Sequence, residues 1–463
     1  MSKIRMKYKK ITSGTILLSL PAIFIIFCTA HADLASYVQK FDPSYSYELY
    51  KEVDIEGCKA KIINMTSQTW QDITWRHWLV ILSPEGATNS DIALLVINGG
   101  SNNQKEPNLN SVEVKVASIV GKRTKSVIAV LFQVPNQPLF NGKNEDQIIA
   151  YTYDKYLNGE GEEWPLLLPM VKSAVRAMDT IQKVQKETEN QEIKRFLLTG
   201  GSKRGWTTWL TAATRDPRVV AIAPVVIDVL NMKQQMIHQL RCYGTFSSEI
   251  EDYTRLGIQK RMNTPKGSQL LSIVDPFSYK ETLTLPKLVI LGTNDPYWTV
   301  DASNFYFKDF QGDKYLCYQP NTGHDITPIG IATLAEFFFS IKENKSLPKI
   351  TWQLSKNNTI TVKWDNPSGV AYLWRADSTN RDFRNSKWES TQLKGKNKAK
   401  AKLKTPKDGW SAYFVEVRFP GSFGNPFSLC TEMKVLPANK FPFDVDLENV
   451  KAIPVAQSKA ASN

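Results

Sequence analysis

Three polar turns, each directly after a short apolar run, occur along this chain in the order serine, aspartate, histidine. The turns carry Ser202, Asp295 and His324, and the run before each has the composition of a buried strand. In the α/β-hydrolase fold, a nucleophile, an acid and a histidine follow successive strands in the same chain order. The sequence therefore predicts an α/β-hydrolase fold with a mostly parallel sheet, and these three residues as a catalytic triad.

The turn with Ser202 reads Gly-Gly-Ser-Lys-Arg-Gly over residues 200–205, between an apolar strand and a predicted helix over residues 203–214. A bulky residue at Gly200 or Gly201 would obstruct the sharp turn that exposes a nucleophile. The general motif Gly-x-Ser-x-Gly requires glycine at position 204, where this chain has Arg204. The alternative interpretation is that Ser202 only caps the helix, which is a common use of serine.

Four histidines are available as the base that a serine hydroxyl needs near pH 7. His31 lies in a predicted leader segment, and His77 lies in a strand pattern as a packed or edge residue. His238 lies in a helical pattern, where a lone histidine usually belongs to a polar or core face. His324 instead follows a strand and a Pro-Asn-Thr-Gly turn and precedes an apolar helix. It is the predicted base.

Asp295 is the favoured acid because it follows the strand over residues 287–292 directly, in a loop where Pro296 ends the strand. Asp301 is a weaker candidate six residues later, and Asp228, after the preceding strand, is a third. Each of the three aspartates has an alternative role in a turn or a helix cap.

A glycine turn after the strand over residues 92–97 is the candidate oxyanion loop. Glycines there let backbone N–H groups approach a ligand closely. We expect the N–H of Gly100 or Ser101 and the N–H of Lys203, the residue after the nucleophile, to donate together to the developing oxyanion.

Several long motifs are similar to those of a known family. They are the run over residues 198–209, the run Val-Pro-Asn-Gln-Pro-Leu over 134–139, the run over 164–171, and Gly-Thr-Asn-Asp-Pro-Tyr over 292–297. Together they resemble the PhoPQ-activated pathogenicity-related protein family over roughly residues 35–435, and Arg204 agrees with the family pattern. The resemblance implies an α/β-hydrolase fold, bacterial export, and an association with virulence and resistance to antimicrobial peptides. It supplies no substrate.

The N-terminus has the pattern of a secretory signal peptide. Basic residues precede an apolar stretch over residues 16–27, and Ala30-His31-Ala32 supplies the small residues of a cleavage site. An uncleaved anchor is the alternative, but the apolar stretch is short for a membrane span and contains Pro21. We expect cleavage near Ala32, a periplasmic or secreted protein, and no transmembrane segment after cleavage.

Removal of the leader takes away five basic residues and lowers the formal net charge from +13 to +8. A basic mature chain favours anionic surfaces, and export argues against nucleic acid as a partner. The four remaining cysteines allow two disulfides in three connectivities, with buried free thiols as the alternative. They are Cys58, Cys242, Cys317 and Cys430. No cysteine or histidine spacing suggests a metal, and no cofactor is expected.

Composition and hydrophobic patterning together predict four parts. They are a signal peptide (1–32), a hydrolase domain (33–345), a β-sandwich of immunoglobulin or fibronectin type (346–438) and a loose tail (439–463). Strands alternate with helices before residue 346, and short alternating strands separated by turns follow it. Residues 229–285 form a polar insertion between two strands, where hydrolases carry a cap.

Lysine recurs at every second position in one segment of the predicted sandwich, so the lysines would project from one face of a strand. They are Lys394, Lys396, Lys398, Lys400, Lys402 and Lys404. Such a face usually protects an edge strand. The alternative is contact with an anionic envelope surface such as lipopolysaccharide or phospholipid headgroups.

Two functions are therefore open. The first is a serine esterase or peptidase that acts on a small-molecule or peptide substrate beneath the cap. The second is a catalytically idle hydrolase scaffold that acts as an exported binding or signalling factor, because a fold does not determine a function.

Overall fold

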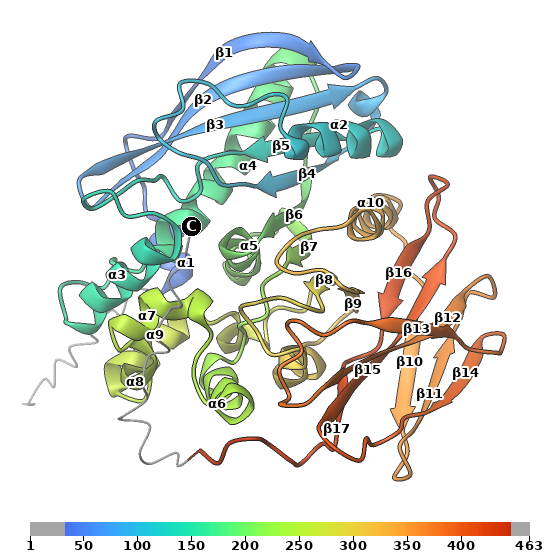
Figure 1. Cartoon of the computed structure of the whole chain (residues 1–463). Coiled ribbons are helices and arrows are strands. Elements are labelled where there is room, and N and C mark those ends of the chain that lie inside the picture. The colour runs from blue at the N-terminus through green and yellow to red at the C-terminus, as the bar shows by residue number, and fades with distance from the viewer. Residues whose placement is uncertain (1–32, 446–463) are drawn as a thin grey trace, which may run out of the picture. The chain divides into compact units, whose positions relative to one another are not determined.

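The computed structural model describes residues 33–445. Within them, nine strands form one sheet in the order β1-β2-β3-β5-β4-β6-β7-β8-β9 (Figure 1). Neighbouring strands from β5 to β9 in this order run parallel, whereas β1, β2 and β3 are antiparallel and β3 joins β5 antiparallel. The strands are β1 (Ser46–Ile55), β2 (Cys58–Trp70), β3 (Ile73–Pro84), β4 (Ile92–Ile97), β5 (Val127–Leu131), β6 (Arg195–Gly201), β7 (Val219–Val225), β8 (Lys287–Gly292) and β9 (Lys314–Gln319).

Helices cover both faces of this sheet, because the side chains of each buried strand alternate between the faces. In β4, Leu95 packs into the cluster with helices α1, α3, α4 and α5, whereas Leu94 packs into the cluster with α2 and α10. The helices are α1 (Leu34–Gln39), α2 (Val112–Thr124), α3 (Glu145–Leu157), α4 (Leu167–Glu189), α5 (Lys203–Ala213) and α10 (Pro328–Lys342). The layers and the strand order confirm the predicted α/β-hydrolase fold.

The segment between β7 and β8 contains the predicted insertion, and it is helical. Its elements are α6 (Met232–Tyr243), α7 (Glu251–Arg255), α8 (Ile258–Arg261) and α9 (Pro265–Val274), with short 3-10 turns at Ser248–Ile250 and Pro276–Tyr279. Met232, Met236 and Met262 are buried within this segment. The insertion thus has an apolar inner side despite its polar composition.

The C-terminal part is antiparallel and has two sheets, as predicted. One has the order β10-β11-β14, and the other has the order β13-β12-β15-β16, with β17 also paired to β15. The strands are β10 (Ile350–Leu354), β11 (Thr359–Trp364), β12 (Val370–Ser378), β13 (Glu389–Gln392), β14 (Lys398–Lys402), β15 (Trp410–Phe419), β16 (Phe427–Cys430) and β17 (Lys434–Leu436). Both hydrophobic clusters continue from the parallel sheet into these strands, so the two parts share one core.

Three other predicted features have a place in this fold. Cys58, Cys242, Cys317 and Cys430 are all buried free thiols, which is the alternative to two disulfides. Lys398, Lys400 and Lys402 are exposed on the edge strand β14, where Ala399 and Ala401 face inward. Lys394, Lys396 and Lys404 lie outside this strand, so the expectation that all six lysines project from one strand is wrong. The predicted signal peptide lies outside the described residues. Part of the predicted tail is described, and there the N–H of Phe443 donates to the carbonyl of Arg241 on α6.

Candidate active site

Ser202 lies at the end of β6 and immediately before α5, in a strained backbone conformation. Its φ of 57° and ψ of −127° fall in a region that non-glycine residues rarely adopt. Its N–H donates to the carbonyl of Val225 at 2.9 Å, but its side chain makes no capping hydrogen bond to the helix. The alternative role as a helix cap therefore fails, and the strained turn instead leaves the half-buried hydroxyl uncommitted to α5.

Two glycines allow this turn, and their positions explain the unusual motif. A Cβ on Gly200 would lie 2.8 Å from backbone atoms of Arg204, and a Cβ on Gly205 would lie 2.8 Å from the carbonyl oxygen of Gly200. At Gly201, by contrast, a Cβ would meet nothing within 4 Å. The expectation that Gly201 relieves crowding is therefore wrong, and the second essential glycine is Gly205 rather than a residue at position 204.

His324 and Asp295 are hydrogen-bonded at the ends of the neighbouring strands β9 and β8. The Nδ1 atom of His324 lies 2.7 Å from Oδ2 of Asp295, and the other carboxylate oxygen accepts the N–H of Tyr297 at 2.9 Å. Gly292 permits this approach, because a Cβ there would lie 2.0 Å from the carbonyl oxygen of Gly323. The carboxylate thus fixes the orientation of the imidazole, as a triad acid does.

The second imidazole nitrogen of His324 is directed away from Asp295. Nε2 is buried and has no hydrogen-bond partner among residues 33–445. The ring of His324 packs against that of Tyr297 at a centroid distance of 4.4 Å, and Tyr297 and Ser202 line the same pocket. The imidazole, the serine and the pocket therefore lie at one edge of the sheet, where the parallel strands end.

The two other candidate acids have different surroundings. Asp301 accepts a hydrogen bond from Arg381 at 2.9 Å and lies 2.8 Å from Nε2 of His238, so this buried group serves a second histidine rather than His324. Asp228 is buried, and burial together with the nearby Asp295 raises its pKa to about 8. A carboxyl that is mostly protonated at pH 7 cannot stabilise an imidazolium by charge.

The remaining histidine in the described residues is structural. His77 is buried in β3, where Nε2 lies 3.0 Å from the hydroxyl of Ser67 and Nδ1 lies 3.1 Å from the carbonyl of Phe132. Burial lowers the pKa of His77 to about 4, so it is neutral at pH 7. Both His77 and His238 therefore have the packed roles that their sequence patterns suggested.

The candidate oxyanion donors lie on two adjacent segments. Lys203 is the first residue of α5, where backbone N–H groups have no acceptor within the helix. Gly100 follows β4, the strand next to β6, and has a φ of 141° that favours glycine. The N–H of Ser101 points to Oε1 of Gln104 at 3.5 Å, which favours Gly100 as the second donor. The role of Gly100 and Lys203 as the two oxyanion donors stays a prediction.

Arg204 connects the serine turn to the oxyanion loop, a role that the sequence did not reveal. Its guanidinium binds Glu145 through two bonds of 2.9 and 2.6 Å and donates to the carbonyl of Val134 at 2.5 Å. Burial opposes ionisation of Glu145, but the charges of Arg204 and Lys203 outweigh it and lower the pKa to about 2. A Cβ on Gly99 would lie 2.7 Å from the guanidinium. Arg204 thus holds the serine turn and the oxyanion loop in place relative to each other.

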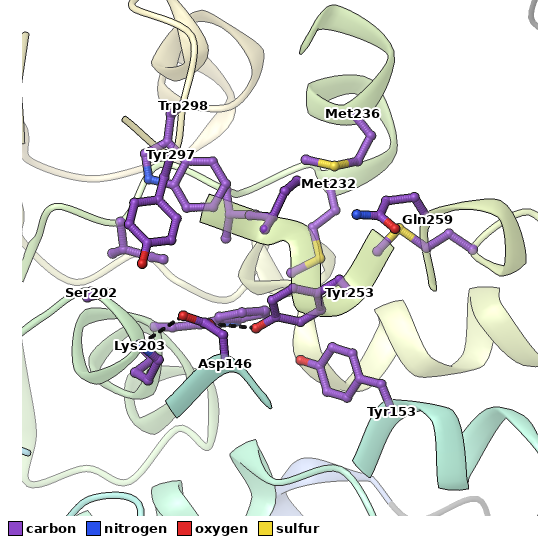
Figure 2. A pocket seen from close by; sticks show the side chains of 15 residues that line it. Asp146, Tyr153, Ser202, Lys203, Met232, Met236, Tyr253, Gln259, Tyr297 and Trp298 are labelled. Carbon is purple, nitrogen blue, oxygen red and sulfur yellow. Dashed lines mark hydrogen bonds and ion pairs between the residues drawn. The ribbon is translucent and has the colours of Figure 1, made fainter. Parts of the chain in front are cut away.

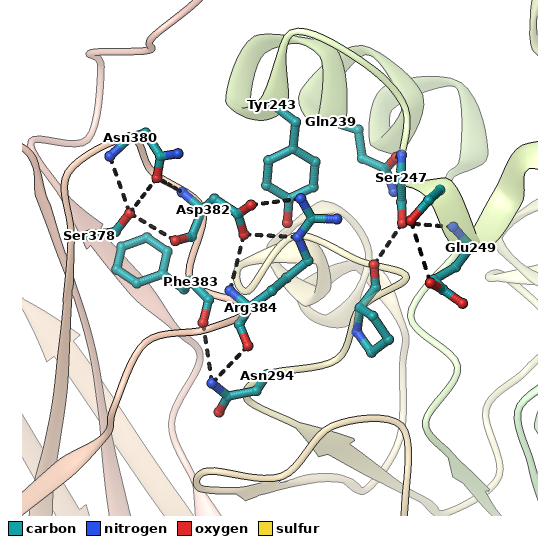
Figure 3. A network of polar contacts seen from close by, with 12 residues as sticks. Gln239, Tyr243, Ser247, Glu249, Asn294, Ser378, Asn380, Asp382, Phe383 and Arg384 are labelled. Atoms are coloured by element: carbon teal, nitrogen blue, oxygen red, sulfur yellow. Dashed lines mark hydrogen bonds and ion pairs between the residues drawn. The ribbon is translucent and has the colours of Figure 1, made fainter. Parts of the chain in front are cut away.

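The β-sandwich holds the acid loop and the histidine loop in place. Nδ2 of Asn294, beside the acid, donates to the carbonyls of Phe383, Arg384 and Ser386 at 3.3, 3.1 and 2.7 Å. Figure 3 shows the first two of these bonds. Asn321, in the histidine loop, bonds both the N–H and the carbonyl of Trp388 through its amide, at 2.7 and 3.0 Å. One sandwich segment therefore positions the backbone on both sides of the His324–Asp295 pair.

The insertion holds the acid loop from the other side. The side chains of Gln239, Tyr243 and Ser247 donate to the carbonyls of residues 297, 298 and 296 at 2.7, 3.1 and 2.7 Å. Figure 3 shows the bond that Ser247 donates. The loop that carries Asp295 is consequently fixed between α6 and the sandwich.

The pocket beside Ser202 lies under the insertion (Figure 2). It contains about 600 Å3 of space including its mouth. Its lining comes from α3, the start of α5, the insertion and the acid loop, and is mostly aromatic and aliphatic. Such a lining with few polar groups is typical of a small-molecule site.

Between Asp33 and Val445, no cluster of histidine, cysteine and acidic side chains has the form of a metal site. In the same part of the chain, no helix is long and apolar enough to cross a membrane. The lysine segment is distant in sequence from the triad, and within residues 33–445 it makes no hydrogen bond or ion pair to Ser202, Asp295 or His324. Its contact with an anionic surface stays a prediction.

Comparison with known proteins gives a family and several distant structural neighbours. The sequence profile of the PhoPQ-activated pathogenicity-related protein family matches residues 34–384, which include Ser202, Asp295 and His324. Autocrine proliferation repressor protein A of Dictyostelium discoideum is 31% identical over 474 residues, covering 92% of this chain and 94% of that protein. The acetyl xylan esterase from Paenibacillus sp. R4 has a TM-score of 0.46 at 14% identity, covering 68% of this chain and 92% of that one. The S-formylglutathione hydrolase from Agrobacterium tumefaciens has a TM-score of 0.41 at 11% identity, covering 64% and 97%.

Proposed function

The chain belongs to the PhoPQ-activated pathogenicity-related protein family, and from this membership and its site geometry we propose that it is a serine hydrolase acting on an ester or a peptide. The observation that carries the proposal is the 2.7 Å bond between His324 and Asp295, with Nε2 of His324 buried and unpartnered within residues 33–445. A serine on a strained turn at the same sheet edge supplies the nucleophile.

In the proposed reaction, Oγ of Ser202 attacks the substrate carbonyl carbon while Nε2 of His324 takes the hydroxyl proton. Asp295 stabilises the imidazolium, and the N–H groups of Lys203 and Gly100 bind the oxygen that gains negative charge. The carbon–oxygen or carbon–nitrogen bond of the leaving group then breaks, and the leaving group takes the proton from His324. Water, deprotonated by His324, attacks the acyl-serine and releases the acid and Ser202.

A fluorophosphonate probe tests this proposal directly. We expect the folded protein to bind one probe covalently at Ser202, identified by mass spectrometry of the labelled peptide, because an activated serine attacks phosphorus and a free hydroxyl does not. Heat-denatured protein is the control and should not react. Folded protein without label at Ser202 would exclude the hydrolase.

An idle scaffold with a signalling role is the second candidate. The relative that favours it is the Dictyostelium protein, whose name describes a repressor of proliferation. An intact serine, histidine and acid set argues for the hydrolase, and the same labelling experiment separates the two candidates.

The proposal extends to export from a bacterial cell and to the virulence association of the family. The basic start, apolar stretch and Ala30-His31-Ala32 support cleavage near Ala32. We expect the intact mass of the exported protein to correspond to a chain that begins at or near Asp33. Exported protein that retains Met1 would contradict cleavage.

A further inference from the structure

The pocket beside Ser202 has two chemically different walls (Figure 2). One wall is apolar and includes Met232, Met236 and Met262 from the insertion. The other wall carries polar groups from α3, α5 and α7, among them Lys203, Asp146 and Tyr253. A ligand that fits both walls has an apolar side and a polar side.

The charges of the polar wall are already paired. Nζ of Lys203 lies 3.1 Å from Asp146 and 2.8 Å from Glu145, and the hydroxyl of Tyr253 donates to Asp146 at 2.9 Å. Asp146 and Lys203 are the charged residues of the lining, and they carry opposite charge. A charged ligand group would therefore lose its hydration without gaining a free counter-charge. An uncharged group avoids this cost of burying a charge.

Tyr153 is an unpaired polar group of this wall, and Nε1 of Trp298, in the acid loop, is a second unpaired group of the lining within residues 33–445. Its side chain is buried with 1% exposure, its ring lies 6.2 Å from that of Tyr253, and its hydroxyl has no hydrogen-bond partner within residues 33–445. In Figure 2, the hydroxyls of Tyr153 and Tyr253 both point toward the side of the pocket where Asp146 lies. A buried hydroxyl without a partner is costly, and a ligand oxygen that reaches it removes that cost.

We propose that this pocket binds an uncharged aliphatic acyl group that carries a hydroxyl, with Tyr153 as the residue that selects for the hydroxyl. This inference rests on the proposed hydrolase, because the acyl group is the part of the substrate that becomes attached to Ser202. The methionine wall contacts the chain, and its flexible side chains adapt to the chain's shape. Burial raises the pKa of Tyr153 further above its usual range, and the nearby Asp275 and Asp146 add to this, so the phenol stays protonated and can donate.

The test compares 4-nitrophenyl hexanoate with its isomeric hydroxy derivatives, hydroxylated at carbon 3 or 6, positions from which the hydroxyl does not readily displace nitrophenol by forming a five- or six-membered lactone. We expect wild-type protein to have a higher kcat/KM for at least one hydroxy ester than for the hexanoate, by about tenfold or more, because a buried hydrogen bond replaces an unpaired group. Tyr153→Phe should lower kcat/KM for that ester by about 10- to 100-fold and leave the hexanoate unchanged.

Tyr156→Phe is the matched control, because Tyr156 is another buried tyrosine of α3 that does not line the pocket. It should keep the preference of the wild type. Tyr153→Phe should also melt no lower than wild type, since the hydroxyl makes no bond inside the described protein. A purely structural role predicts a lower Tm with an unchanged ester preference.

The outcomes separate this inference from the proposed function. Equal kcat/KM for all esters, or a preference that survives in Tyr153→Phe, would overturn the inference while a fluorophosphonate label at Ser202 still upheld the hydrolase. A labelled protein that cleaves none of the esters would also overturn it. Absence of both label and hydrolysis would overturn the hydrolase and this inference together.

Discussion

Replacement of Ser202 by alanine is expected to lower kcat for ester hydrolysis by on the order of 10⁶, the loss found when the nucleophile of an assembled triad is removed. The reason is that no other group at the end of β6 can form the acyl intermediate. The backbone strain at Ser202 is unchanged by the substitution, because alanine has the same conformational limits. The melting temperature should therefore stay close to that of the wild type.

Ser248→Ala is the matched control for this experiment, since Ser248 is exposed on the insertion. It removes the same hydroxyl from a surface position and should leave kcat and KM unchanged. Hydrolysis by Ser202→Ala at a rate near that of wild type would show that the activity belongs to another group or to a contaminant.

The position of each candidate triad residue after a strand could be predicted from the sequence, because it depends on local order along the chain. The serine, acid and histidine each follow a buried strand, and an apolar run with a polar turn is visible without tertiary knowledge. The helix after Ser202 was predicted over residues 203–214, close to the observed bounds of α5 (Lys203–Ala213). Family membership was predicted from long motifs and is confirmed.

The rest depended on contacts between residues far apart in sequence. Arg204 and Glu145 are 59 residues apart, and Asn321 and Trp388 are 67 residues apart. A single sequence does not pair such residues, because the same asparagine or arginine suits an exposed loop equally well. Glu145 at the start of α3 was a weak signal, since acidic residues in a first helical turn usually serve the helix dipole.

The insertion shows a similar limit. Its helices are short, and α7 and α8 span only 5 and 4 residues, so periodicity over a window of normal length cannot detect them. Their buried methionines appear as scattered apolar residues in a polar segment. The functional consequence was also hidden, because the pocket forms only when the insertion folds over α3 and the acid loop.

The sandwich also has a role that its sequence did not suggest. Its Phe383, Arg384, Ser386 and Trp388 backbone groups bind Asn294 and Asn321, on either side of the triad pair. Positioning of this kind matters for catalysis, since a small displacement of a catalytic group from its productive geometry lowers the rate strongly. The sandwich is therefore part of the support for the candidate active site.

The substitution Asp295→Asn is expected to lower kcat about 10⁴-fold, with little change in stability or KM. An amide in place of the carboxylate cannot stabilise the imidazolium of His324 and favours the wrong tautomer at Nδ1. Asp325→Asn is the matched control, because Asp325 is exposed directly after His324. It should leave kcat nearly unchanged, which separates the bonded carboxylate from a nearby charge.

Asp301→Asn should have the opposite profile. The substitution leaves the buried Arg381 without its counter-charge, and breaking a buried ion pair typically costs about 3–5 kcal/mol of folding free energy. We therefore expect a clearly lower Tm, while kcat per fluorophosphonate-labelled site stays near the wild-type value, because Asp301 serves His238 rather than His324. Counting labelled sites removes the effect of the unfolded fraction on the measured rate. A mild loss in Asp295→Asn together with a severe loss of kcat per labelled site in Asp301→Asn would assign the acid to Asp301 and reject the pairing of His324 with Asp295 as the catalytic one.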